Sequence, residues 1–113
     1  MLFIEFPAFT KAVTKLPDDD YAIFQNELVA DFEQGALIRG TGGFRKARMA
    51  FPSAGVGKSG GARVIYLYLA EQQIVVLITL YAKARKEDLS KAEENELRKI
   101  SAEIRCSLGT GKS

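Results

Sequence analysis

The stretch FRKARMAFPSAGVGKSGGARVIYLYL, at residues 44–69, combines two strand-like runs with a glycine-rich segment between them. The second run, at residues 62–69, is rich in β-branched and aromatic side chains, which is typical of a strand. The segment before it contains four glycines, as expected for a hairpin loop. We therefore predict two neighbouring strands joined by a mobile glycine-rich loop.

The end of that loop, Gly57-Lys58-Ser59, matches the last part of the P-loop pattern G-x-x-x-x-G-K-[ST]. A P-loop needs a glycine at its first position and a helix after the Lys-Ser pair, because the first amides of that helix bind the phosphates. Here Pro52 occupies the first position and a strand follows. The stretch is therefore not expected to bind a nucleotide.

The rest of the chain predicts a small α+β fold with a mainly antiparallel sheet, two N-terminal helices and a C-terminal helix. Further strands are expected at residues 2–6 and 73–83. A short first helix carries Phe9, Ala12, Val13 and Leu16, and Pro17 with the acids at positions 18–20 starts the second, with a capping carboxylate. Gly35 is expected to end the second helix, and Ser90 with Glu93 has the spacing of a capping box for the last. A single domain is expected at residues 1–108, followed by a disordered tail at 109–113.

The composition narrows the possible chemistry. The 113 residues contain no histidine and one cysteine, so the usual zinc sites cannot be built and no cofactor is expected. Acid–base chemistry would have to use Lys, Arg, Tyr, Asp or Glu. No apolar run is long enough for a membrane helix, and the N-terminus lacks signal-peptide features, so we expect a cytoplasmic protein without a membrane partner. The lone Cys106 is interpreted as a small apolar residue of the last helix.

The charge distribution is strongly uneven. Residues 39–86 contain nine basic residues and one acid, a charge of +8, whereas the remainder carries −6. A basic middle flanked by acidic helices indicates a surface that binds a polyanion. The alternative is that these charges are solvated sheet edges.

Residues two apart in a strand share a face, so Lys46 projects with Arg48, and Tyr81 with Lys83. Arg63 begins the strand between them, beside the glycine-rich loop, and we expect Arg63 and Lys83 at the surface. A sheet that gathers these five side chains would form a phosphate-binding cleft with an aromatic ring for a base to stack on. Their cations can stabilise a phosphorane, and a Lys or Tyr acting as base would need a pKa below its usual value of about 10. From these residues alone, an RNA-binding domain with or without nuclease activity is expected.

Three segments together resemble a known family. They are IRGTGGFRKARMAF, GGARVIYLYL and VVLITLYAKARKEDLS, and the chain is similar to the RelE/HigB superfamily of type II toxin–antitoxin toxins, in particular its HigB-like branch. The resemblance implies a metal-independent endoribonuclease that enters the ribosomal A site, cleaves translated mRNA by attack of the ribose 2′-OH and inhibits translation. It assigns the catalytic positions to Lys46, Arg48, Arg63, Tyr81 and Lys83. It leaves open which group is the base, because a later tyrosine of RelE proper corresponds to Leu89. Further RNA contacts are expected from Arg45, Lys58, Arg85 and Lys86.

The resemblance also implies partners. These are the 70S ribosome with mRNA and a cognate helix-turn-helix antitoxin, through whose complex alone the toxin would reach operator DNA. Two alternatives stay open: a degenerate module that binds RNA or antitoxin without cleaving, and a gyrase-targeting toxin of the same fold.

Overall fold

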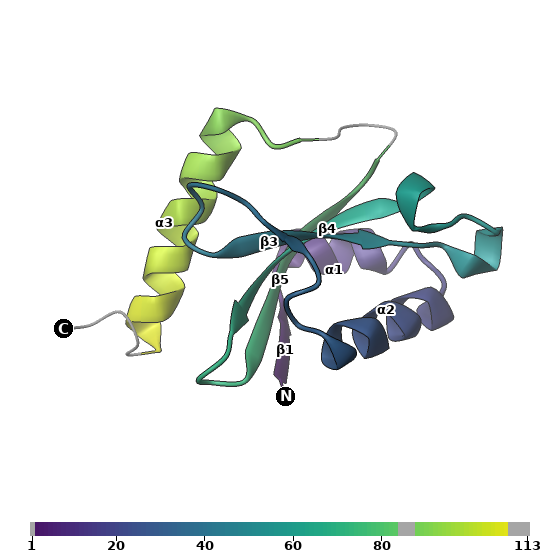
Figure 1. Ribbon diagram of the computed structural model, residues 1–113, viewed down its shortest axis with the longest axis horizontal. Helices are drawn as coiled ribbons and strands as arrows, with labels where there is room; N and C mark the ends of the chain where they lie inside the picture. Colours follow the sequence, from purple (N-terminus) through teal and green to yellow (C-terminus); the bar gives the residue numbers. More distant parts are fainter. Residues whose placement is uncertain (1, 84–87, 109–113) are drawn as a thin grey trace.

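The computed structural model describes residues 2–83 and 88–108. Its core is a five-stranded sheet in the order β1-β5-β4-β3-β2, with helices on both faces (Figure 1). The strands are β1 (Leu2–Glu5), β2 (Ala36–Leu37), β3 (Phe44–Met49), β4 (Ala62–Leu69) and β5 (Ile74–Ala82). The helices are α1 (Pro7–Val13), α2 (Asp18–Ala30) and α3 (Lys91–Ser107). The predicted α+β class is confirmed, with two helices before the central hairpin and one after the sheet.

Most of the sheet is antiparallel, as predicted. The strands β3, β4 and β5 form an antiparallel meander, and the short β2 pairs antiparallel with β3. The exception is β1, which pairs parallel with β5, so the first and last strands of the chain lie side by side. The strand β2 was not predicted, because its two residues sit in a turn-rich segment with no alternating pattern of their own.

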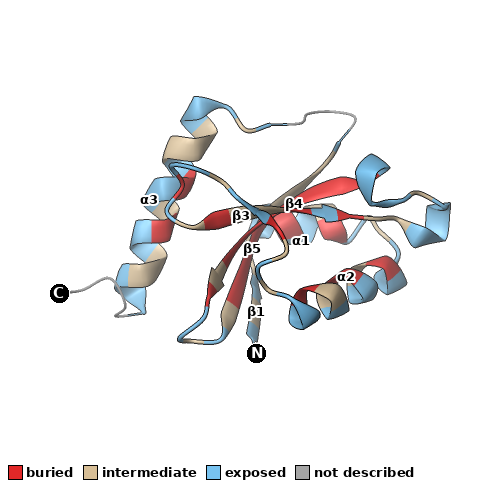
Figure 2. Ribbon diagram, viewed as in Figure 1, coloured by how far each residue is buried: buried red, intermediate tan, exposed pale blue. Residues whose placement is uncertain are grey.

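Each face of the sheet has its own apolar core (Figure 2). On one face, α1 and α2 bury Phe9 and Leu28 against Ala47 of β3. On the other, α3 packs Leu97 against Phe44 and neighbouring strand residues. The alternation along β3 therefore sends Ala47 and Met49 toward α1 and α2, and Phe44, Lys46 and Arg48 toward the side of α3.

Two expectations about the second helix were wrong. It ends at Ala30 rather than Gly35, and its N-cap is Pro17, without a side-chain cap. The segment after Ala30 leaves the helix because the buried Tyr66 hydroxyl of β4 donates to the Phe32 carbonyl at 2.8 Å and accepts from the Gly35 amide at 3.1 Å. Gly35 is required by this close approach, since a Cβ there would lie 2.9 Å from the Tyr66 ring.

The remaining sequence expectations concern the capping box of α3, Cys106, the C-terminal tail and membrane helices. The capping box of α3 is present, with Ser90 Oγ accepting from the Glu93 amide at 3.1 Å and Glu93 Oε1 accepting from the Ser90 amide at 2.8 Å. Cys106 lies in α3 but is exposed, so it does not serve as a core residue. The proposed tail at 109–113 lies outside the described residues. No helix within the described ranges combines the length and apolar composition that a bilayer crossing requires.

Candidate functional site

Three of the predicted site residues form a row across the sheet. Arg48 on β3 is the direct partner of Arg63 on β4, and Arg63 is in turn the partner of Tyr81 on β5. Direct partners in an antiparallel pair point to the same face, with Cβ atoms about 4.5–5.5 Å apart. The sheet therefore brings these side chains together as one cross-strand row, at the end of the strands where the glycine-rich loop lies.

Arg63 is buried, contrary to the sequence expectation. It is 2% exposed, and its Nη1 donates to the Ala62 carbonyl at 3.3 Å and to the Lys58 carbonyl at 3.5 Å. The burial follows from its place on the central strand, between β3 and β5, with the glycine-rich loop folded back toward it. A buried charge is costly unless it is hydrogen-bonded, and the carbonyls of Lys58 in the loop and Ala62 in β4 accept hydrogen bonds from this one.

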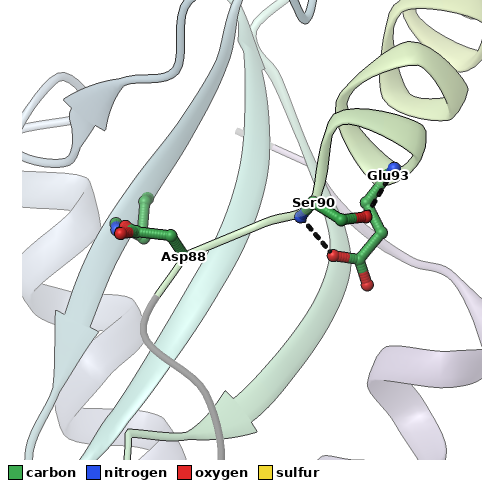
Figure 3. Close-up of polar contacts among 4 residues, drawn as sticks. Asp88, Ser90 and Glu93 are labelled. Atoms are coloured by element: carbon green, nitrogen blue, oxygen red, sulfur yellow. Dashed lines mark hydrogen bonds and ion pairs between the residues drawn. The ribbon is translucent and has the colours of Figure 1, made fainter.

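Lys46 lies one position further along the same face of β3. Its Nζ is 2.9 Å from Asp88 Oδ1, and the lysine side chain is 23% exposed while that of Asp88 is 80% exposed. Asp88 lies two residues before Ser90, the first residue of the capping box that starts α3 (Figure 3). The ion pair therefore joins β3 to the start of α3. It was not predicted, although Asp88 belongs to one of the segments that carried the resemblance.

Lys58 joins this group from the loop. It lines a hollow of about 380 Å³ together with Lys46 and Arg48, at the edge of β3 beyond the end of β2. Its Nζ lies 3.4 Å from Glu27 Oε1 of α2. The hollow thus collects three cationic side chains from two segments, and open walls of this kind suit an extended polyanion better than an enclosed small molecule.

Lys83 is exposed directly after β5. Its amide donates to the Gly61 carbonyl at 3.0 Å, which continues the β4–β5 ladder and holds Lys83 beside the start of β4. It therefore lies at the same end of the sheet as the cross-strand row, and its predicted surface position is confirmed.

A further predicted RNA contact, that of Arg45, is not brought to this face. Arg45 points to the opposite side of β3, where its Nη1 donates to the carbonyls of Glu33 at 3.1 Å and Gly35 at 2.8 Å. Its guanidinium holds the segment after α2, which is a structural role. Arg85 and Lys86 lie outside the described residues.

The other three tyrosines lie in the core or pack against it. Burial raises the pKa of Tyr66, and Tyr68 stacks on Phe32 with ring centroids 4.8 Å apart. Burial and a 2.6 Å hydrogen bond to Glu5 likewise raise the pKa of Tyr21. Within the described parts of the chain, no group of three His, Cys, Asp or Glu side chains is placed to hold a metal ion.

Comparison with known proteins shows which family and which solved structures this chain resembles. A family model described as the RelE toxin of the RelE/RelB toxin–antitoxin system matches residues 10–109. The RelE of a Pyrococcus horikoshii OT3 RelE–RelB complex is similar in fold, with a TM-score of 0.52 and 18% identity, over 75% of this chain and 97% of that one. Isolated Escherichia coli RelE toxin also has a TM-score of 0.52, with 17% identity over 88% of this chain and 97% of that one. At these identities the structures show a shared fold, and the HigB-like branch stays a prediction.

Proposed function

The chain belongs to the RelE toxin family, and we propose that it is a ribosome-dependent endoribonuclease that cleaves translated mRNA in the ribosomal A site and so inhibits translation. The observation that carries the proposal is the cross-strand row of Arg48, Arg63 and Tyr81, beside a hollow lined by Lys46 and Lys58. Cations at this density, next to an aromatic ring, suit a phosphate with a base stacked beside it.

The proposed reaction is an internal displacement. The ribose 2′-oxygen bonds to the adjacent phosphorus while the bond from phosphorus to the 5′-oxygen breaks. The 2′-proton passes to a base and the leaving 5′-oxygen takes up a proton, which gives a 2′,3′-cyclic phosphate and a 5′-hydroxyl. The chain has no histidine, so Lys46, Tyr81 and Lys83 are the candidates for these proton transfers.

The two arginines have different proposed roles. Arg48 is exposed and can bind a non-bridging phosphate oxygen on arrival. Arg63 donates to the backbone carbonyls of Ala62 at 3.3 Å and Lys58 at 3.5 Å. Shorter charge-assisted bonds to the phosphorane would replace these, so Arg63 would act most strongly as negative charge builds up. In this scheme side-chain cations supply the electrostatic stabilisation, and no metal is required.

The proposal extends to an antitoxin partner. The Pyrococcus RelE of similar fold was crystallised with RelB. We propose that this chain is likewise neutralised by an antitoxin, a helix-turn-helix protein that covers the basic face and carries the pair to operator DNA. Because ribosomes and mRNA are the proposed targets, the site of action would be the cytoplasm.

Primer extension on a translated mRNA, after controlled expression of the chain, tests this function. Cuts within codons that disappear when translation is blocked would support it. Growth arrest with intact transcripts would contradict it and favour a non-cleaving module. Intact transcripts together with damaged DNA would instead favour a gyrase-targeting toxin.

A further inference from the structure

We propose that Asp20 is a positioning residue that binds Ser53 and thereby fixes the glycine-rich loop, residues 50–61, so that Lys58 stays at the hollow. The inference rests on the proposed function, in which Lys58 contacts RNA. It assigns a role to α2, which contributes no side chain to the cross-strand row.

Asp20 differs from the other two acids that begin α2. Asp18 and Asp19 are exposed, whereas Asp20 is 2% exposed. Its Oδ1 accepts from the Ser53 hydroxyl at 2.8 Å and from the Ser53 amide at 3.1 Å. Its Oδ2 is buried and has no hydrogen-bond partner within the described residues. Burying a carboxylate in this way is energetically costly. The hydrogen bonds that offset this cost are the two that Asp20 accepts from Ser53.

Ser53 belongs to a structured part of the loop. It lies in the 3₁₀ turn Pro52–Ala54, which is closed by a two-way backbone bridge between Phe51 and Val56. A second 3₁₀ turn, Lys58–Gly60, begins two residues after Val56. Fixing Ser53 therefore fixes the segment from which Lys58 projects.

A second contact between α2 and the glycine-rich loop lies further along the helix. Glu27 is seven residues after Asp20, about two turns on, so both side chains lie on one side of α2. Glu27 Oε1 meets Lys58 Nζ at 3.4 Å, but this pair is partly exposed and is worth little by itself. The attachment of Ser53 to the buried Asp20 carboxylate is therefore the stronger of the two. The Lys58 carbonyl, which accepts from Arg63, is carried by the same loop.

The test compares Asp20→Ala and Ser53→Ala with the matched control Asp19→Ala. The control removes the same charge from an exposed neighbour, so it measures the purely electrostatic gain in RNA binding. One readout is amide hydrogen exchange at Ser53, and the other is the dissociation constant for a single-stranded RNA oligonucleotide at two salt concentrations. Ser53→Thr, which keeps the hydroxyl, is the conservative rescue.

We expect Asp20→Ala to speed exchange at the Ser53 amide by about tenfold or more, the change expected for a lost hydrogen bond to a charged acceptor. RNA binding should weaken about as much as in Lys58→Ala, and the Asp20→Ala/Lys58→Ala double variant should bind no more weakly than Lys58→Ala alone, because the two residues act through one contact. In cleavage assays KM should rise while kcat is kept.

The inference is overturned if Ser53 exchange is unchanged in Asp20→Ala, or if exchange rises while RNA affinity stays at the Asp19→Ala level. Additive losses in the double variant would also overturn it. If Asp20→Ala does not fold, the same measurements on Ser53→Ala and Ser53→Thr decide the question. Substitutions at Ser53 should leave the fold intact because this residue is exposed. Neither hydrogen exchange nor oligonucleotide binding requires cleavage. A wild-type chain that does not cut mRNA would therefore refute the proposed function, but the exchange and binding results would still decide the role of Asp20.

Discussion

Arg48 and Arg63 are direct partners in the β3–β4 ladder, yet Arg48 is exposed and Arg63 is 2% exposed. Like charges directly opposite each other in a sheet are destabilising. An anion bound between the two guanidinium groups would remove that cost, since each can donate to a shared oxyanion. We therefore expect this pair to be more stable when a phosphate is bound.

The first prediction follows from this pairing. Sulfate or phosphate should raise the Tm of the wild-type chain, relative to chloride at equal ionic strength, because an anion that binds the folded state stabilises it. Arg48→Ala should lose most of that increase and keep only the general effect of these salts on protein surfaces. Thermal scans of both proteins measure the difference, and equal increases would argue against an anion site at the row.

The second prediction concerns stability at the two cationic positions beside the loop. Arg63→Ala should lower the free energy of unfolding by about 1–3 kcal/mol, because it removes a buried, hydrogen-bonded side chain. Lys83→Ala should change it by less than about 0.5 kcal/mol, since its side chain is exposed and its backbone bond to Gly61 remains. Both variants should lose cleavage. Urea unfolding checks the pair, and equal stability losses would contradict the buried position of Arg63.

The third prediction uses the contact between Lys46 and Asp88. Asp88→Asn should strengthen binding of an RNA oligonucleotide by about two- to fivefold at low salt, because an exposed ion pair of modest strength no longer competes with phosphate. The gain should shrink at high salt, where exposed charges are screened. Glu71→Gln, an exposed acid in the turn between β4 and β5, is the control for net charge. Weaker binding in Asp88→Asn would instead mean that Asp88 orients Lys46 for RNA.

The fourth prediction concerns alkaline pH. Burial raises the pKa of Tyr66 in the folded chain, whereas an unfolded tyrosine loses its proton near its ordinary value of about 10. The unfolded state therefore ionises first, and the contribution of Tyr66 to stability, complete below that pH, falls as the pH rises above it. Wild type should be more stable than Tyr66→Phe at pH 7 by about 1 kcal/mol, and the gap should narrow above pH 10. Unfolding measured across this range would contradict the account if the gap stayed constant.

The fold was predictable because its signals are local. The alternation in β3, the strand composition of β4 and the capping box at Ser90 each act within a few residues. The misplaced end of α2 has a non-local cause, the contact of Tyr66 with Phe32 and Gly35, which are more than thirty positions away in sequence. The parallel pairing of β1 with β5 is likewise set by the path of the whole chain.

The site was predictable in part for the same reason. Strand alternation and the family resemblance together gave the residues of the cross-strand row and placed Lys46 with Arg48. They could not give the burial of Arg63, which depends on how the loop folds back over β4. The same alternation places Arg45 on the face opposite Lys46 and Arg48, so its orientation was predictable, although its bonds to the carbonyls of Glu33 and Gly35 were not. The contacts of Asp20 and Asp88 join segments far apart in the chain, and no local pattern marks them.

The most direct test of the central claim is the chemistry of the cut itself. Programmed 70S ribosomes would be given an mRNA with an unmodified A-site codon, or one carrying a single 2′-O-methyl group at the nucleotide before the cleaved bond, and the purified chain would be added. The account predicts that the unmodified mRNA is cut to a 2′,3′-cyclic phosphate and a 5′-hydroxyl, while the methylated mRNA stays intact. Cleavage of the methylated mRNA, or products ending in a free 3′-hydroxyl and a 5′-phosphate, would contradict it.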